Sequence, residues 1–392
     1  MTALRDYSYI YSAVRTPIGK FNGAFSAVPA PDLAAIAIAE ALKRSGVSGS
    51  DVNAVYLGNV LSAGLGQAPA RQASLKSGLP EHVGASTINK VCGSGLESVI
   101  LADQAVRLGQ ADFVVAGGME NMSRAPFLIP QLRKGHKLGN TTVIDSMIHD
   151  GLWDSHEGRQ MGELCESLAK QFAYSRDTQD AYAITSYTRA RNAQESGKFT
   201  KEIANVSIIE KGHEKIITKD EQPFADNLEE FPFLPPVFDK DQGTITKGNG
   251  AKLSDGASAL IVGRESTNLS PIAKITAYTS HAQSPKTFAL APVEAVRKIL
   301  SENRLGVDDI DLFEINEAFA VMSLAVNELL CLDPGKVNVY GGSIALGHPI
   351  GATGARILVT LINALQEKKL KRGLVSLCIG GGEAIAMIIE MV

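Results

Sequence analysis

The sequence predicts an α/β fold built from two related halves, with a different region inserted between them. Residues 36–59 and 293–317 share one pattern: an apolar helix, a polar turn that contains glycine, and an apolar strand. Residues 111–121 and 373–384 share a second pattern, an apolar strand that runs into a glycine-rich turn and a glutamate. Strands that alternate with helices are typical of α/β proteins. Their repetition in the same order indicates two halves of one design.

Each predicted half also contains a glycine-rich turn that opens a helix, CGSGLESVILADQAV in the first and GHPIGATGARILVTLINAL in the second. Apolar residues recur there at helical spacing: Leu96, Val99, Ile100 and Val106 in the first helix, and Leu358, Leu361, Ile362 and Leu365 in the second. This spacing places them on one face, so we expect each helix to bury that face in the core.

The repeats set the expected domain boundaries. The first half takes residues 1–118 and resumes at 250–271, where another buried strand is expected, and the second half takes residues 272–392. Residues 119–249 are richer in charge, proline and aromatics, with helical patterning over 161–195. We expect them to form a loop domain inserted into the first half. A separate middle domain is the alternative.

The composition excludes several classes of protein. The chain has 392 residues, with 38 Lys and Arg against 42 Asp and Glu, and this charge of −4 argues against a nucleic-acid partner. No apolar run reaches the roughly 18 residues of a membrane span, and the polar stretch Met1–Ile10 does not resemble a secretion signal. The four cysteines form no C-x-x-C pair. We therefore expect reduced thiols in a cytoplasmic protein without a bound metal.

Cys92 is the candidate nucleophile, because it stands at the start of the first glycine-opened helix. Unpaired N–H groups and a partial positive charge at a helix N-terminus favour a thiolate. The glycines beside it would allow a substrate carbonyl to approach the backbone. The structural alternative is a small buried cysteine that caps the helix.

Three further segments carry candidate groups. His348 lies between Gly347 and Pro349 in a glycine-rich loop, where an accessible imidazole could act as a base near neutral pH. Cys378 ends an apolar strand, and the N–H groups that follow it, from Gly380 onward, could form an oxyanion hole. Asn316 ends another strand and could hold a water molecule or an oxyanion.

Each group also has a structural interpretation: a structural histidine, a tight β-turn, and an asparagine helix cap. Taken together, however, the groups supply a nucleophile, a base, a second thiol and N–H donors. All of them lie at strand–helix turns, where open α/β sheets place their ligand sites.

These blocks, in this order, resemble the thiolase family, which includes acetyl-CoA acetyltransferases and 3-ketoacyl-CoA thiolases. The resemblance covers nearly the whole chain and rests on six segments: RTPIGKFNGAF, NKVCGSGLESV, GGMENMS, NEAFA, GGSIALGHPIGATG and CIGGG. It implies a five-layered αβαβα fold with two pseudo-equivalent halves and a loop domain that binds CoA and mediates oligomerisation. It also implies ping-pong acyl transfer between CoA thioesters, without a metal or a bound cofactor.

The roles that the resemblance implies fall on matching positions. Cys92 matches the nucleophile that accepts the acyl group, and His348 matches the base that deprotonates it. Cys378 matches the acid/base that moves the α-proton of the second acyl-CoA. Asn316 matches the residue whose bound water, together with His348, holds the thioester oxygen. The backbone N–H groups of Cys92 and Gly380 match the other oxyanion hole.

The same resemblance implies contacts with substrate and CoA from Ile148, Gln160, Met161, Ala251, Phe288 and Phe319. Three of these positions depart from the short-chain members of the family. Gln160 stands where these members usually have histidine, Ala251 where they commonly have serine, and Phe288 where they commonly have methionine. His156 is nearby but does not align with the usual histidine. No basic residue in 220–233 matches the usual nucleotide contact. The length of the acyl chain and the physiological direction therefore stay open, including a degradative enzyme for medium or long chains.

Residues 124–140 resemble the tetramerisation loop of the family, which implies a homodimer or a homotetramer. The basic residues of this loop, Arg133, Lys134, His136 and Lys137, could contact CoA phosphates or simply face solvent. We keep two other functions open, a ketoacyl synthase and a non-catalytic acyl-CoA or lipid carrier. Cys378 argues against the synthase, which uses histidine there. A dehydrogenase is disfavoured because no G-x-G-x-x-G follows the first strand.

Overall fold

The computed structural model describes residues 5–392, so residues 1–4 of the predicted first half lie outside the described part. Its main strands form one hydrogen-bonded path in the order β14-β15-β16-β13-β1-β12-β5-β3-β4. The bounds of these strands are β1 (Ser8–Arg15), β3 (Val52–Gly58), β4 (Gly84–Ile88), β5 (Phe113–Asn121), β12 (Ser254–Gly263), β13 (Ala273–Ala282), β14 (Leu312–Ile315), β15 (Arg372–Ile379) and β16 (Glu383–Met391).

The path contains the same arrangement twice. In the N-terminal half, β3 is parallel to β5, β5 is antiparallel to β12, and β12 is antiparallel to β1. In the C-terminal half, β14, β15, β16 and β13 pair in the same senses. The two halves meet where β1 and β13 pair antiparallel. The predicted α/β fold with two halves of one design is confirmed.

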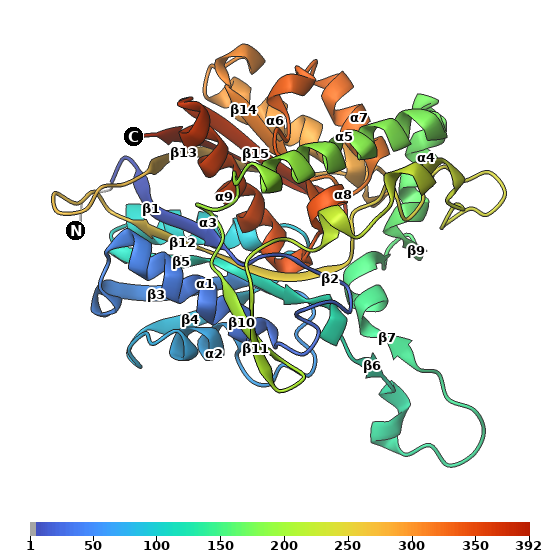
Figure 1. Ribbon diagram of the computed structural model, residues 1–392, viewed down its shortest axis with the longest axis horizontal. Helices are drawn as coiled ribbons and strands as arrows, with labels where there is room; N and C mark the ends of the chain where they lie inside the picture. Colours follow the sequence, from blue (N-terminus) through green and yellow to red (C-terminus); the bar gives the residue numbers. More distant parts are fainter. Residues whose placement is uncertain (1–4) are drawn as a thin grey trace.

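The helices complete five layers (Figure 1). Their bounds are α1 (Ala30–Ser45), α2 (Pro69–Lys76), α3 (Ser94–Arg107), α6 (Ala291–Glu302), α7 (Ala320–Leu329), α8 (Ser343–Leu346) and α9 (Ile350–Lys368). Helix α1 packs on β1, β5 and β12, and α6 packs on β13, β15 and β16. Helices α3 and α9 pack on each other between the halves, and α9 contacts strands of both. The order of layers is therefore αβαβα, as the resemblance implied.

The region between β5 and β12 holds short hairpins and two longer helices. Its elements are β6 (Phe127–Leu128), β7 (Ile144–Asp145), β8 (Trp153–Asp154), β9 (Arg159–Gln160), α4 (Met161–Phe172), α5 (Arg176–Glu195), β10 (Val206–Glu210) and β11 (His213–Ile217). The helical pattern over 161–195 is thus split in two. Ala173 takes a positive φ, and Ser175 then caps α5 by accepting from the Thr178 N–H.

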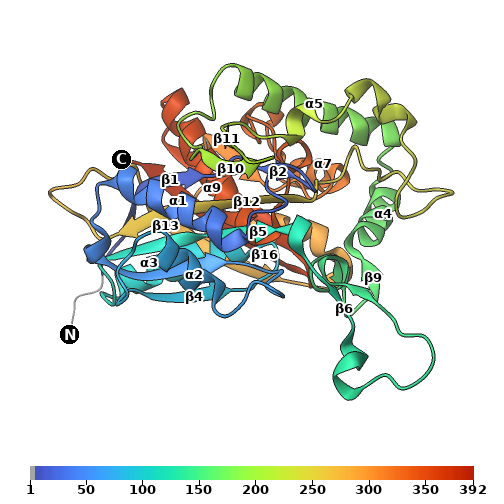
Figure 2. The ribbon, with the colours of Figure 1, turned by 60° about the horizontal axis from the view of Figure 1, so that its bottom comes forward.

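Single helical turns and one short strand complete the structure: β2 (Gly19–Lys20), η1 (Gly49–Asp51), η2 (Met122–Arg124), η3 (Pro130–Lys134), η4 (Met147–Leu152), η5 (Gln222–Phe224), η6 (Leu228–Phe233), η7 (Pro285–Leu290), η8 (Val307–Asp309) and η9 (Pro334–Lys336). Figure 2 shows the β6–β7 segment extending away from the layered body. Within residues 5–392, no helix is both long enough and apolar enough to cross a membrane.

The glycines expected in a turn after β5 lie inside that strand instead. A Cβ on Gly117 would meet the Ser258 carbonyl oxygen at 2.0 Å, and one on Gly118 would meet the Gly351 carbonyl oxygen at 2.1 Å. These glycines therefore allow β5 to approach β12 and the start of α9 closely. These contacts join residues that are far apart in the sequence. The local sequence pattern therefore could not show whether the glycines lie in a closely packed strand or in a turn.

Replacing Gly118 by alanine is expected to destabilise the protein by about 1–3 kcal/mol, because the added methyl group would push α9 away from β5. Urea unfolding would measure the loss. Gly84→Ala is a matched control, since a Cβ there meets nothing within 4 Å. Equal stability of the two variants would contradict this account of the packing.

Candidate active site

Cys92 lies in a strained turn between β4 and α3. Val91 has a φ of 48°, which is unfavourable for a β-branched residue. The Ser94 hydroxyl holds the turn closed, since it accepts from the Lys90 N–H at 2.8 Å and donates to the Val91 carbonyl at 2.6 Å. Strain of this kind persists only where the surroundings hold it, and it is common at functional sites.

The glycines that follow Cys92 serve packing within the protein. A Cβ on Gly93 would meet Ile379 Cδ1 at 2.5 Å, and one on Gly95 would meet the Ala355 nitrogen at 2.8 Å. Protein atoms thus fill the space in which we expected a substrate to approach the backbone. Because they lack a side chain, these glycines instead allow α3, α9 and the end of β15 to pack closely around Cys92.

His348 is held by one hydrogen bond of its backbone and one of its ring. Its backbone N–H donates to the Lys252 carbonyl at 2.9 Å, and its Nδ1 lies 2.6 Å from the Thr353 hydroxyl. That hydroxyl donates its proton to the Pro349 carbonyl at 2.9 Å, so its oxygen must accept from Nδ1–H. The neutral ring therefore carries its proton on Nδ1, which leaves the Nε2 lone pair free to act as a base.

The surroundings also keep the imidazole neutral. Burial, together with the smaller effect of the Arg356 charge, lowers the pKa of His348 to about 3. Below pH 6.5, the ordinary pKa of histidine, the unfolded chain binds a proton at this position, whereas the folded protein does not until the pH approaches 3. The contribution of His348 to the free energy of unfolding consequently decreases as the pH falls from 6.5 toward 3.

We expect this linkage to appear when the wild-type protein is compared with His348→Asn. Between pH 6.5 and 4.5 the wild type should lose about 2 kcal/mol of unfolding free energy relative to the variant. Urea unfolding at several pH values would measure the difference. Other titrating groups, such as Glu120, are present in both proteins and cancel to first order. A difference that is constant over this range would contradict the low pKa.

Cys378 and Gly380 come from the end of β15 and the turn after it. Gly381 and Gly382 take positive φ angles of 90° and 94°, which turns the chain sharply into β16. The backbone N–H groups of Gly380 and of Cys92 itself act to lower the pKa of the Cys92 thiol, so both lie close to its sulfur. Two N–H groups beside a candidate nucleophile are what an oxyanion hole requires.

Both thiols are protonated at neutral pH. Burial raises the pKa of Cys92 to about 11, although the two N–H donors act in the opposite direction. The pKa of Cys378 is raised well above its ordinary value by burial and by the neighbouring Cys92 and Cys165. The expectation that the helix N-terminus makes Cys92 more acidic is therefore wrong, because desolvation outweighs it. Cys92 needs a base to become a nucleophile.

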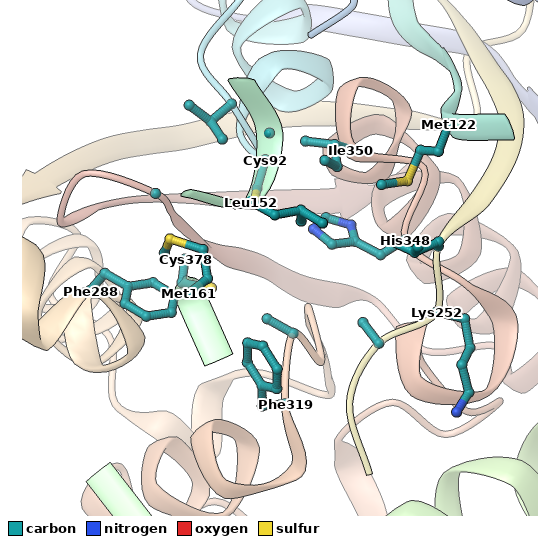
Figure 3. Close-up of a pocket in the computed structure, with 16 residues that line it drawn as sticks. Cys92, Met122, Leu152, Met161, Lys252, Phe288, Phe319, His348, Ile350 and Cys378 are labelled. Carbon is teal, nitrogen blue, oxygen red and sulfur yellow. The ribbon is translucent and has the colours of Figure 1, made fainter. Parts of the chain in front are cut away.

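The three groups share one cavity of about 80 Å³, although they are far apart in sequence. Figure 3 shows Cys92, His348 and Cys378 around the same space, with Phe288 and Met161 beside Cys378 and Phe319 below them in this view. The predicted residues on its wall are Cys92, His348, Cys378, Gly380, Met161, Ala251, Phe288 and Phe319. The geometry thus brings the candidate nucleophile, the candidate base and the second thiol to one small cavity.

A larger apolar pocket of about 380 Å³ adjoins this cavity. Met161, Ala251 and Phe319 line both, while Gln160 and Ile148 line only the outer pocket. The two spaces together resemble a channel that ends at the catalytic groups. The basic residues of the β6–β7 segment line neither pocket.

Asn316 lies behind the cavity wall. It is buried, and its Oδ1 accepts from the Ser343 hydroxyl at 2.6 Å, while its Nδ2 has no hydrogen-bond partner among the described residues. A free donor at this place fits the predicted role of holding a water molecule. The structure thus places the asparagine near the site but outside its wall.

Sequence reasoning missed eight residues on the cavity wall: Val91, Met122, Gly151, Leu152, Lys252, Leu253, Ala318 and Ile350. Four of them, Val91, Met122, Ala318 and Ile350, stand within motifs already singled out, which is the only local signal they carry. Lys252 contributes mainly through its backbone, and Figure 3 shows its side chain pointing away from the catalytic groups. Over residues 5–392, no three metal-ligating side chains cluster in a way that could hold a metal ion.

Comparisons with known proteins agree with this geometry. Models for the N-terminal and C-terminal domains of thiolase match residues 8–266 and 269–391. A probable acetyl-CoA acyltransferase of Staphylococcus aureus is 48% identical over 385 residues, which is 97% of this chain and 98% of that protein. The crystal structure of a Bacillus anthracis acetyl-CoA acetyltransferase has a TM-score of 0.97, 39% identity and full coverage of both chains. That of an Ascaris suum thiolase in complex with coenzyme A has a TM-score of 0.93 and 42% identity, and covers 98% of this chain and all of that one.

Proposed function

The chain belongs to the thiolase family and is an acyltransferase, and we propose that it works by ping-pong acyl transfer through a covalent acyl-Cys92 intermediate. In one direction CoA cleaves a 3-ketoacyl-CoA, and in the other two acetyl-CoA condense to acetoacetyl-CoA. The observation that carries this proposal is the convergence of Cys92, His348 and Cys378 on one cavity. Coenzyme A is substrate and product, and no other cofactor is proposed.

The first half-reaction forms the acyl-enzyme. Nε2 of His348 takes the Cys92 proton as the sulfur attacks the thioester carbonyl, and the N–H groups of Cys92 and Gly380 hold the developing oxyanion. The C–S bond to CoA then breaks, and the Cys378 thiol gives its proton to the departing sulfur. The site is left with acyl-Cys92, an imidazolium and the Cys378 thiolate, whose opposite charges stabilise each other.

The second half-reaction forms the carbon–carbon bond. The Cys378 thiolate takes an α-proton from the second acyl-CoA, whose enolate oxygen is held by His348 and by the water on Asn316. The α-carbon attacks the acyl group, the bond to the Cys92 sulfur breaks, and His348 returns the proton to that sulfur. Every group regains its starting state, and cleavage is the same sequence in reverse.

The outer pocket supports binding of the apolar arm of CoA, since it leads to the catalytic groups and is lined mainly by apolar side chains. We propose that Ile148, Gln160, Met161, Ala251 and Phe319 contact this arm, and that Phe288, which is buried on the cavity wall, contacts the acyl group. With Phe288 filling part of the cavity, short acyl chains are favoured, and a degradative enzyme for longer chains is the alternative.

A panel of 3-ketoacyl-CoA substrates of increasing length, each cleaved with CoA and compared by kcat/KM, tests both the class and the chain length. The highest value with acetoacetyl-CoA supports the short-chain proposal. A maximum at longer chains supports the degradative alternative. Acyl-CoA binding without cleavage at any length would indicate a non-catalytic carrier and overturn the proposed mechanism.

We further propose that the protein is cytoplasmic and assembles as a homodimer or a homotetramer. The edge strand β4, which leads directly into the Cys92 turn, has one free edge among the described strands. The segment between β6 and β7 and its flanks expose the apolar side chains of Phe127, Leu132, Leu138 and Val143. Such a protruding apolar surface is typical of a contact between subunits. Sedimentation of the wild-type protein would give its oligomeric state.

A further inference from the structure

A hydrogen-bonded relay runs behind the active site from Arg356 on α9 to Asn316 after β14. The Arg356 Nη2 donates to the Ser343 hydroxyl at 2.8 Å, and this hydroxyl lies 2.6 Å from the Asn316 Oδ1. All three residues are almost completely buried, with 1% or less of each exposed. The relay therefore operates without competition from bulk solvent.

The chemistry of the three groups fixes the direction of the relay. A guanidinium only donates, so the Ser343 oxygen must accept from Arg356. The single hydroxyl proton then has its acceptor in the Asn316 Oδ1. This arrangement determines which end of the asparagine amide faces Ser343 and turns Nδ2, which has no partner among the described residues, to the other side.

Two members of the relay, Asn316 and Ser343, contact segments that hold the candidate catalytic groups. The Asn316 N–H donates to the Ser376 carbonyl at 3.0 Å, two residues before Cys378. The Ser343 carbonyl accepts from the Lys252 N–H, and the Lys252 carbonyl accepts from the His348 N–H. Ser343 is thus tied to the base through one backbone residue and to Asn316 through its hydroxyl.

Burial of the Arg356 guanidinium costs free energy that its hydrogen bonds do not fully offset. Its Nε and Nη1 have no hydrogen-bond partner among the described residues, and neither has Oε1 of its neighbour Glu314. The charges of the two side chains attract each other. An apolar side chain at position 356 would avoid this cost, because buried charges seldom add stability. The charge of Arg356 is therefore better explained by a function in the candidate active site than by a contribution to stability.

We propose that Arg356 and Ser343 are positioning residues, which orient the Asn316 amide so that its Nδ2 serves the enolate oxygen of the second acyl-CoA. This inference rests on the proposed function, in which Asn316 acts only in the carbon–carbon step. The relay consequently affects that step and not the transfer of acyl groups to Cys92.

Two assays of the intact protein separate these steps. Exchange of the acetyl group between acetyl-CoA and isotopically labelled CoA reports acyl transfer, and cleavage of acetoacetyl-CoA by CoA reports the carbon–carbon step. For Ser343→Ala we expect kcat for cleavage to fall about tenfold, with exchange and KM close to wild type. Arg356→Met should also lower cleavage more than exchange, although the loss of its charge also raises the pKa of His348. Arg356→Lys keeps the charge and still donates, so it should restore part of the cleavage rate.

A double variant tests whether the two residues act as one unit. Asn316→Ala with Ser343→Ala should cleave no more slowly than Asn316→Ala alone, since the relay has nothing left to orient. Thr360→Val is the matched control. Thr360 is a buried hydroxyl one turn further along α9, and it donates to Glu202 at 3.1 Å, outside the relay. This variant should match the wild type in both assays.

The outcomes distinguish the relay from the proposed function. If Asn316→Ala impairs cleavage but Ser343→Ala does not, or if the two losses add, the relay is overturned and the function stands. If Ser343→Ala slows exchange and cleavage equally, the residue is merely structural and the relay is again overturned. A wild-type protein that carries out neither exchange nor cleavage would overturn the function itself.

Discussion

Replacing Cys92 by serine is expected to abolish the covalent acyl-enzyme and to lower both exchange and cleavage by about 10⁴-fold or more. A serine hydroxyl is much less acidic and less nucleophilic than a thiol. Burial already raises the pKa of the thiol to about 11, and it would disfavour an alkoxide still more strongly. His348 is a neutral imidazole whose burial makes it a weak base, so it cannot compensate.

Incubation with radiolabelled acetyl-CoA, followed by denaturation and counting of bound label, measures the intermediate. Cys331→Ser is the matched control, since Cys331 is a free thiol on the surface and should not affect labelling. Label retained on the Cys92→Ser protein, together with substantial turnover, would contradict the proposed need for a thiol at position 92.

The candidate catalytic groups could be singled out because each one stands in a local pattern that indicates a turn. The expectation that every such turn joins a strand to a helix is wrong for two of them, since His348 lies between α8 and α9 and Cys378 lies before the turn from β15 to β16. Cys92 precedes a glycine-opened helix, His348 lies in a glycine-rich loop, and Cys378 ends an apolar strand. Parallel strands and their helices meet at a common edge, so such turns gather even when the sequence separates them. The αβαβα order followed from the same repeats together with the family resemblance.

What could not be predicted depends on contacts between distant segments. Gly117 and Gly118 were expected in a turn because their local pattern does not reveal that β12 and α9 press against β5. The acidity expected for Cys92 was wrong for the same reason, since its burial arises from several elements at once. Which ring nitrogen of His348 carries the proton could not be predicted either. It depends on the Thr353 hydroxyl, five residues away, and on the Pro349 carbonyl to which that hydroxyl donates.

Replacing Cys378 by alanine is expected to separate the two half-reactions. Cleavage and condensation should fall by about 10³-fold or more, because no other group in the cavity is suited to move the α-proton. Exchange of acetyl groups with labelled CoA should continue at a reduced rate. CoA can then leave as a thiolate, although without a proton from Cys378. Both rates can be measured on one preparation, with the labelled acyl-Cys92 as evidence that the site is folded.

The contrast between Cys378 and its neighbour Cys165 makes this prediction specific. Cys165 is completely buried on α4 and close enough to raise the pKa of Cys378, but it does not line the cavity. Cys165→Ala should therefore leave exchange and cleavage in their wild-type ratio, even if it lowers stability. If Cys378→Ala instead slowed exchange as severely as cleavage, its thiol would be needed to form the acyl-enzyme. The proposed roles of the two sulfurs in the two half-reactions would then be wrong.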